Sequence, residues 1–258
     1  MTRLISILLV VCFMSVAVVH AAPPTRFPNG VNNAISTADT GDMRLLDPSK
    51  THMYWEDWDY YNSGNWTVTE VEAGAGSATQ ALATAFGDGG ILLLTNAAGD
   101  NDYILMEKVG KSFAFAGGED IWYKTRFKIS DATQTDMLAG LVISGATSPV
   151  ASDPGLTDGV FFSKSDGAAT VDFIIRKNSV STTASSIATM EDDTFIELAL
   201  YYDVTSGIEY WVDGVQVGTS VVTNIPDDEI MIVGFGVQNG EAVAKTMSID
   251  YIMVNKNR

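Results

Sequence analysis

The sequence predicts an all-β fold, in which a single large β-sandwich follows an extended arm. Beyond His52, apolar residues recur with a period of two almost everywhere, and no window of a dozen residues carries a helical stripe. Hydrophobic residues make up 46% of the 258 residues and aromatic residues 10%, enough to fill a substantial core. No internal repeat at a fixed period is present, which favours one sandwich over an array of small units.

The N-terminal region differs from the rest of the chain. Arg3 precedes an apolar stretch from Leu4 to Val19, and small residues follow, which is typical of a secretory signal cleaved after Ala21. A short membrane anchor and a start codon placed too early are the alternatives. Proline, Asn and Asp are frequent from Pro23 to Pro48, which predicts an extended arm. The predicted organisation is therefore a signal-like or anchor segment at 1–21, an arm at 22–51 and one sandwich at 52–258.

About fifteen short strands are expected in the sandwich, because runs of alternating or β-branched residues are separated by Gly, Asp, Asn and Pro. In chain order the predicted strands are 53–61, 66–72, 91–95, 103–108, 112–116, 120–130, 137–144, 159–163, 170–177, 186–190, 194–203, 207–213, 215–220, 229–238 and 245–255.

Four local patterns support individual elements. In the strand at 120–130, apolar residues alternate with Trp122 and three basic residues, so we expect one buried face and cations that pair with carboxylates of neighbouring strands. Asp213 and Gly214 form the dipeptide that a two-residue hairpin needs. Gly234 and Gly236 inside an apolar strand predict a bulge or a close approach of another backbone. The Ser/Thr-rich segment 179–186 is expected to be a loop or an edge strand.

Charge and composition exclude several function classes. The chain carries 32 Asp and Glu against 15 Lys and Arg, a formal charge of −17, which repels phosphate backbones and argues against a nucleic-acid partner. Cys12, the only cysteine, lies in the apolar leader, so disulfides and thiolate metal sites are not expected. Beyond the leader His52 is the only histidine, which argues against a Ser-His-Asp triad and against a zinc hydrolase.

Aromatic and acidic residues suggest a carbohydrate site. Asp57 and Asp59 alternate with Trp55 and Tyr61 in the predicted first strand, so the four side chains are expected to share one face. Aromatic rings stack on sugars, and neighbouring carboxylates accept hydroxyl hydrogen bonds; the alternative is that these aromatics belong to the core. No catalytic residue is predicted. The full predicted carbohydrate-binding set is Trp55, Asp57, Trp58, Asp59, Tyr61, Trp122 and Trp211.

Calcium is the only cofactor that the sequence leaves open, and otherwise no cofactor is expected. Loop carboxylates and amides are the ligands that a hard cation prefers, and they gather at Asp100, Asn101, Asp102, Asp153 and Asp158. The alternative is that Asp and Asn favour tight turns there for conformational reasons.

Several segments resemble the concanavalin A-like and laminin-G-like sandwiches. They are FIELALYYD at 195–203 with IEYWVDGVQVG at 208–218, similar to a late hairpin of that superfamily, SIDYIMV at 248–254, similar to its closing strand, and YWEDWDYYNSGNW at 54–66, similar to its entry strand. The resemblance implies a concanavalin A-like jelly-roll β-sandwich. The alternating Glu-x-Asp-x-Glu strand of the superfamily's glycosidases is missing, so a glycoside hydrolase or lyase is the least favoured alternative.

Longer segments resemble uncharacterised proteins encoded by marine tailed phages. They are RFPNGVNN at 26–33, GDGGILLLTNAAGDND at 87–102, KTRFKISDATQ at 124–134, DGVFFSK at 158–164 and VQNGEAVAKTMSIDYI at 237–252. This resemblance implies a non-enzymatic virion structural or decoration protein at the virion surface, with capsid or tail proteins as partners of the arm from Pro23 to Pro48. Cell-surface glycans and a second copy of the chain are further candidate partners. The alternative is a lectin-like carbohydrate-binding module, secreted or periplasmic through the signal-like segment.

Overall fold

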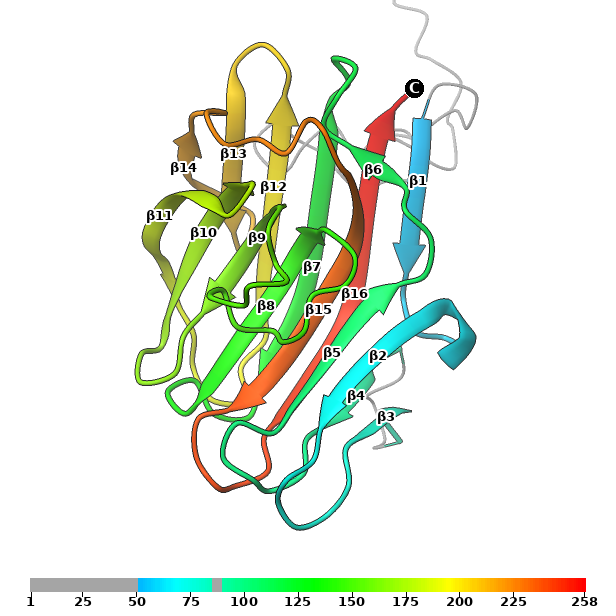
Figure 1. Ribbon diagram of the computed structural model, residues 1–258, viewed down its shortest axis with the longest axis vertical. Helices are drawn as coiled ribbons and strands as arrows, with labels where there is room; N and C mark the ends of the chain where they lie inside the picture. Colours follow the sequence, from blue (N-terminus) through cyan, green and yellow to red (C-terminus); the bar gives the residue numbers. More distant parts are fainter. Residues whose placement is uncertain (1–50, 85–89) are drawn as a thin grey trace, which may run out of the picture.

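The computed structural model describes residues 51–84 and 90–258, which form two antiparallel β-sheets packed face to face (Figure 1). In this part of the chain the helical structure is a single short turn of 3-10 type at Ser63–Asn65. No helix of the described residues has the length and apolar character needed to cross a membrane. The predicted signal-like segment and the predicted arm up to residue 50 lie outside the described residues.

Sheet I has the strand order β14-β13-β12-β7-β16-β4-β3, and β1 pairs with the C-terminal half of the long strand β16. Its strands are β1 (Thr51–Glu56), β3 (Thr79–Leu82), β4 (Leu92–Thr95), β7 (Ile121–Ile129), β12 (Ile196–Asp203), β13 (Gly207–Val212), β14 (Val215–Ser220) and β16 (Thr246–Asn257).

Sheet II has the order β11-β10-β9-β8-β15-β5-β2, with β6 paired to the start of β15. Its strands are β2 (Trp66–Val71), β5 (Tyr103–Lys108), β6 (Phe113–Ala114), β8 (Thr135–Val142), β9 (Gly159–Lys164), β10 (Thr170–Lys177), β11 (Val180–Thr189) and β15 (Ile230–Asn239). The predicted all-β sandwich is confirmed.

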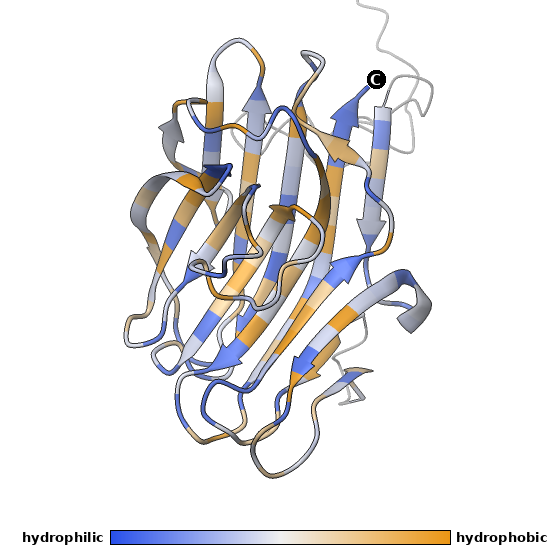
Figure 2. Ribbon diagram, viewed as in Figure 1, coloured by the Kyte–Doolittle hydropathy of each residue, from blue (hydrophilic) through white to orange (hydrophobic). Residues whose placement is uncertain are grey.

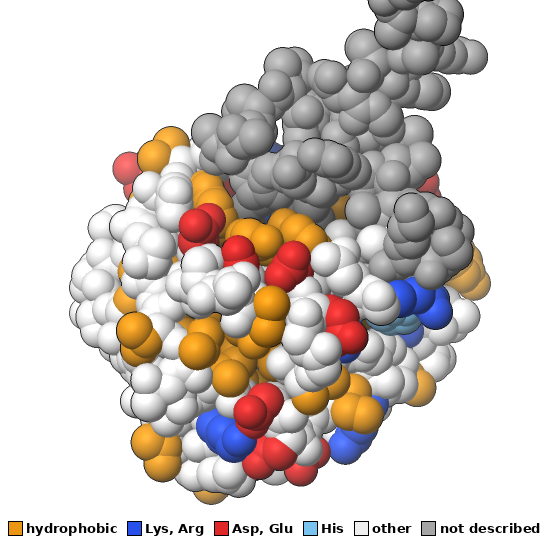
Figure 3. Space-filling model, turned by 90° about the horizontal axis from the view of Figure 1, so that it is seen from above, with side chains coloured by type: hydrophobic (Ala, Val, Ile, Leu, Met, Phe, Trp, Pro, Cys, Tyr) orange, Lys and Arg blue, Asp and Glu red, His pale blue; other side chains and the backbone are white. Residues whose placement is uncertain are grey.

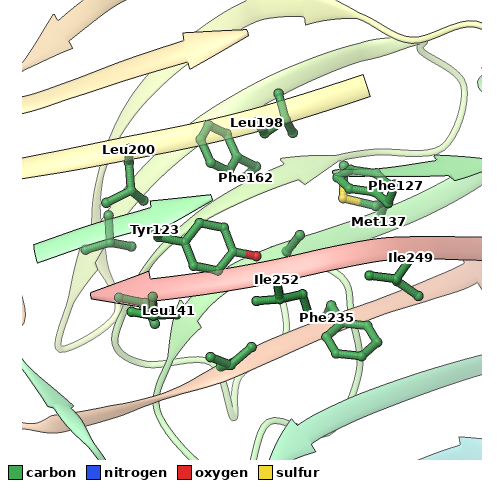
Figure 4. Packing of buried hydrophobic residues seen from close by; sticks show 14 of the residues in the cluster. Tyr123, Phe127, Met137, Leu141, Phe162, Leu198, Leu200, Phe235, Ile249 and Ile252 are labelled. Atoms are coloured by element: carbon green, nitrogen blue, oxygen red, sulfur yellow. The ribbon is translucent and has the colours of Figure 1, made fainter. Parts of the chain in front are cut away.

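The core lies between the two sheets. Alternate residues of each strand point inward, so hydrophobic and hydrophilic segments alternate along the ribbons (Figure 2). Tyr123 and Ile252 of sheet I meet Phe162 and Phe235 of sheet II, and all four are almost completely buried (Figure 4). Large buried side chains contribute about 2 kcal/mol each to the hydrophobic stabilisation, so this layer holds the sheets together without disulfides.

The first strand is shorter than the sequence predicts. β1 ends at Glu56, because Trp58 adopts a left-handed backbone with φ of 50° and turns into the core. The prediction that Asp57 and Asp59 share a strand face with Trp55 and Tyr61 is therefore wrong. The sequence also misses β3, a short strand that pairs only with β4.

The hairpin predicted at Asp213 and Gly214 is confirmed. Val212 and Val215 are register partners, and the two residues between them have φ of 49° and 75°, as a type I′ turn requires. The Ser/Thr-rich segment at 179–186 is mainly part of the edge strand β11, one of its two predicted states.

Glycines keep the outer face of sheet II open to close approach. Gly140 of β8 and Gly234 of β15 are register partners, and Gly236 lies two residues further along β15. A Cβ atom at Gly236 would lie 2.4 Å from the carbonyl oxygen of Ile104 and 3.1 Å from the Cβ of Pro149. The predicted close backbone approach is confirmed, and no bulge interrupts the pairing of β15 with β5 or β8.

We predict that Gly140→Ala lowers the free energy of unfolding by about 3 kcal/mol, because its Cβ would lie 2.5 Å from the Cα of Phe161 and 2.7 Å from a backbone oxygen. Urea unfolding followed by tryptophan fluorescence measures the change. Gly64→Ala is the matched control; its Cβ meets only the side-chain oxygen of Asn62, at 3.3 Å, and the change should stay within about 0.5 kcal/mol. Equal effects of the two substitutions would contradict the steric argument.

Candidate functional site

The outer face of sheet II is covered by the chain's own residues. Residues 143–158, which connect β8 to β9 and are called here the covering segment, lie in front of the sheet (Figure 1). Ala146 and Leu156 of this segment pack into a second buried apolar cluster. Its sheet members are Leu105, Leu138, Val142, Phe161, Ile174 and Ile232.

One carboxylate joins the covering segment to the sheet, and a second fixes the turn within the segment. Glu107 on the outer face of β5 accepts a hydrogen bond of 2.8 Å from the backbone N–H of Gly145. Asp153 accepts bonds of 2.9 and 3.0 Å from the backbone N–H groups of Ser148 and Gly155. Because each carboxylate satisfies donors that would otherwise be unpaired, the segment is held as firmly as a regular element.

The outer face of β9 carries an aromatic ring and a hydroxyl group. β9 directs Phe161 and Ser163 outward, and the guanidinium of Arg176 lies 5.7 Å from the centre of the Phe161 ring and donates to the carbonyl oxygen of Leu156. Among the described strands, none presents three alternating carboxylates on an outer face. A pair of flanking acids, which glycoside hydrolysis requires, is therefore not displayed on the outer face of β9.

The outer face of sheet I carries a row of aromatic and polar side chains, called here the first row. Register places Met53 of β1, Asn255 of β16, Trp122 of β7, Tyr201 of β12 and Glu209 of β13 side by side. The rings of Trp122 and Tyr201 are stacked, with centroids 4.8 Å apart and planes 17° apart. Five strands at about 4.8 Å spacing give the row a length of roughly 19 Å.

The first row lies near the end of the sandwich where β7 begins and β16 ends (Figure 1). Hydrophobic and acidic side chains lie among one another at that end (Figure 3). Burial raises the pKa of the Tyr201 phenol, and the carboxylates of Asp120 and Asp203 raise it further. The Tyr201 hydroxyl is hydrogen-bonded to Asp120, which holds the proton on the phenol.

Ion pairs occupy the next part of the same face. Lys124 pairs with Glu197 at 2.8 Å, and Arg126 pairs with Asp250. The hydroxyl of Tyr251 donates to Glu197, and burial together with that carboxylate raises the pKa of Tyr251. The prediction that basic residues of this strand pair with carboxylates of neighbouring strands is confirmed for Lys124 and Arg126.

The predicted aromatic residues have different positions. Trp122 lies in the first row, and Trp55, 55% exposed, stands on the same outer face beside Met253. Trp58 is 1% exposed, and the centroid of its ring lies 5.6 Å from that of Trp66. The prediction that Trp58 belongs to a binding surface is therefore wrong, because the residue lies in the core. Trp211 is also buried.

The predicted acidic pair follows the end of β1. Asp57, Asp59 and Tyr61 lie in the loop between β1 and the short helical turn. Burial raises the pKa of Asp57, and the carboxylates of Asp59 and Asp250 raise it further. The structure thus brings Asp57 near the charged part of the sheet I face, while Tyr61 packs against the core.

Sequence reasoning missed four members of the first row: Met53, Tyr201, Glu209 and Asn255. Tyr201 lies in a correctly predicted strand, and its alternation with buried Leu200 and Tyr202 is the signal that places it outward. Asn255 alternates with buried Val254 in the same way. Neither pattern reveals that these strands flank β7, because strand order within a sheet is a tertiary property.

The predicted calcium ligands hold turns. Asp102 is fully buried and accepts bonds from the backbone N–H groups of Ala73, Gly74 and Gly99. Its pKa is lowered, because these bonds outweigh the effect of burial.

The other predicted ligands do not complete a metal site. Asp158 accepts from the N–H of Asn178, Asp153 holds the covering segment, Asn101 has φ of 63°, and Asp100 lies in the same turn. No group of three or more His, Cys, Asp or Glu side chains that could hold a metal ion occurs in the described residues. For Asp102, Asp153 and Asp158 the turn-forming alternative describes what the structure shows.

Solved structures identify the architecture. The endo-1,3-beta-glucanase of Streptomyces sioyaensis superposes with a TM-score of 0.56 at 14% identity, covering 82% of this chain and 98% of the glucanase. Peanut lectin superposes with a TM-score of 0.51 at 10% sequence identity, covering 80% of this chain and 97% of the lectin. The fold is that of the concanavalin A-like lectins and glucanases. A third such sandwich is the potassium-bound carbohydrate recognition domain of Emp46p. It superposes with a TM-score of 0.53 at 9% sequence identity, covering 77% of this chain and 94% of that domain.

These structural superpositions establish the concanavalin A-like fold, and at such low sequence identity they establish nothing more specific. Neither a protein-family model nor a curated protein matches the sequence. The concanavalin A-like sandwich carries both lectins and glycoside hydrolases, so function has to be argued from the residues of this chain.

We predict that Asp153→Asn destabilises the protein at neutral pH but not in acid. Burial alone would raise the pKa of Asp153, but its hydrogen bonds outweigh burial and hold the pKa below its usual value of 3.8. A lowered folded-state pKa gives stability that is present above pH 3.8 and lost as the pH falls through the folded value. The difference in free energy of unfolding should be about 2 kcal/mol at pH 7 and should shrink below pH 4.

Urea titrations between pH 3 and pH 7 measure this difference. Asp172→Asn is a suitable control, because that carboxylate accepts one exposed backbone hydrogen bond, from Ser186, on the edge hairpin of β10 and β11. A difference for Asp153→Asn that stays constant across the range would show that charge is not the cause.

Proposed function

We propose that this protein is a non-catalytic carbohydrate-binding protein whose binding surface is the outer face of sheet I around Trp122 and Tyr201. One observation carries the proposal. The stacked Trp122 and Tyr201 rings lie in a row with polar side chains from two further strands, Asn255 of β16 and Glu209 of β13, on a rigid sheet rather than on loops. Such rows suit an extended sugar chain, because each pyranose presents an apolar C–H face and a polar rim.

The surroundings of the row support this function. Large aromatic side chains supply most of the binding energy where they anchor a ligand, and flanking polar groups fix its orientation. The Tyr201 hydroxyl oxygen, whose proton is shared with Asp120, and the Glu209 carboxylate offer hydrogen-bond acceptors. Trp55 adds a further exposed ring on the same face. Lectins are among the proteins that share this fold.

The arrangement of acids supports binding without hydrolysis. On the face of sheet I, Glu197 and Asp250 are each held by a cation, Lys124 and Arg126. On sheet II, the covering segment occupies the outer face. A glycosidase needs one free carboxylate and one proton-donating carboxyl across a sugar bond, and neither outer face of the described sheets displays such a pair.

The location of the protein is proposed on separate grounds from its carbohydrate binding. We place the protein at the surface of a phage particle, with the arm from Pro23 to Pro48 docked on capsid or tail proteins, on the strength of the sequence resemblance alone. Mass spectrometry of purified particles should detect the chain. Its absence there, together with its presence in the culture medium, would favour the secreted alternative.

We predict that Trp122→Ala weakens glycan binding about thirtyfold, which corresponds to about 2 kcal/mol, because it removes one ring of the stacked pair. A glycan array selects the ligand, and isothermal titration calorimetry measures the affinity. Tyr60→Ala, which removes a 73% exposed aromatic ring outside the sheet, is the control and should bind as the unchanged protein does. Failure of the unchanged protein to bind any glycan, or full affinity in Trp122→Ala, would refute the proposal.

A further inference from the structure

Trp211 is buried although it lies on the outer face of a sheet. Its neighbours in β13, Tyr210 and Val212, pack into the core between the sheets, so Trp211 points to the outer face of sheet I. Only 5% of Trp211 is nevertheless exposed. An indole on an outer face reaches such a low exposure only when other side chains lie on top of it.

The described residues around Trp211 do not supply this cover. Its register partners are Ala199, which has a single methyl group, and Gln216, which is itself exposed. Neither apolar cluster of the described residues includes Trp211 or Ala199, although Ala199 is only 1% exposed. The burial arises within a single chain, so the cover belongs to a part of this chain outside 51–84 and 90–258.

The face beside Trp211 is apolar over several strands. Register places Trp55 of β1, Met253 of β16, Lys124 of β7, Ala199 of β12 and Trp211 of β13 side by side, and these residues are called here the second row. Four of its five members are apolar. Covering such a stripe removes apolar surface from water, so an apolar segment of the same chain is stabilised by lying on it.

The reach of the two remaining parts of the chain selects between them. Residues 85–89 join β3 to β4, and β16, β7 and β12 separate β4 from β13. Four strand spacings amount to about 19 Å, whereas a loop of this length reaches about 10 Å from its anchors. Residues 22–50 directly precede β1 and extend up to about 95 Å at about 3.3 Å per residue, so they can cross the whole face.

The composition of residues 22–50 suits this face. The segment carries three basic and three acidic residues, so it is neutral within a chain whose formal charge is −17. An acidic sandwich therefore does not repel it. Met43, Leu45 and Leu46 provide apolar side chains a few residues before Thr51, where the chain enters the sheet beside the first row.

We propose that residues 22–50 dock on the outer face of sheet I and cover it from β16 to β13. The apolar contacts come from Leu45 and Leu46, and Trp211 lies beneath the segment. This inference goes beyond the proposed function, because it holds whether or not the face binds glycans. A glycan competes with the docked segment for the same face, so a capsid or tail protein that takes up the segment would open the face.

Hydroxyl-radical footprinting of the full chain tests the docking, with mass spectrometry to measure the oxidation of each tryptophan. In the unchanged protein Trp211 should oxidise about tenfold more slowly than Trp55, in line with their exposed fractions of 5% and 55%. Trp58, which is 1% exposed in the core, should stay protected and reports in every sample that the sandwich is folded.

Two double variants identify the covering segment. Leu45→Asp combined with Leu46→Asp should raise the oxidation of Trp211 about fivefold, because it removes the apolar contacts of the segment. Asn32→Asp combined with Asn33→Asp is the matched control, since it adds the same two charges at polar positions of the same segment. The control should leave the oxidation of Trp211 unchanged.

Dilution separates docking within the chain from cover by a second copy. Protection of Trp211 that stays constant over about a hundredfold dilution supports the proposal, because association between chains weakens on dilution. Three results would overturn it: oxidation of Trp211 as fast as that of Trp55 in the unchanged chain, protection that is lost on dilution, or equal rates in the two double variants.

Discussion

The close approach that Gly140, Gly234 and Gly236 permit on the outer face of sheet II is the constraint on which the rest of the structure depends. Gly140 and Gly234 make room for atoms of neighbouring strands, and Gly236 also makes room for Pro149 of residues 143–158, which add a second apolar cluster outside the main core. Glu107 and Asp153 then hold that segment through backbone N–H groups. Part of the outer face of sheet II is thereby filled by the chain itself, whereas the exposed Trp55 and the half-buried Trp122 and Tyr201 lie on the outer face of sheet I.

The outer face of sheet I combines two kinds of polar chemistry. In one part, ion pairs join Lys124 and Arg126 to carboxylates of neighbouring strands, so the charges of these side chains are neutralised by one another. In the first row, by contrast, the side-chain amide of Asn255 has no hydrogen-bond partner. The buried, unpaired amide beside the stacked rings lowers local stability, because both of its polar atoms lose their hydrogen bonds to water.

Local patterns in the sequence predicted most of the fold. The alternation around Trp122 placed one face of β7 inward, and the Asp213-Gly214 dipeptide defined a hairpin whose φ angles are both positive. The pattern around Trp58 predicted a strand that is too long, because the alternation of aromatic and acidic residues continues past the point where the backbone turns left-handed. The candidate site was predictable only in part: Trp122 and Trp55 stand out by composition, whereas Asn255 is an ordinary polar residue near the end of a strand.

The sequence by itself determined that the chain is all-β, which residues face inward and where the tight turns lie, because a period of two and turn chemistry act over a few neighbouring residues. Tertiary structure decided which strands are neighbours, and so it alone brought Met53, Asn255, Trp122 and Tyr201 into one row from positions far apart in the chain. It also decided which polar groups find partners. Strand order and register arise from the packing of the whole core, which no local pattern encodes.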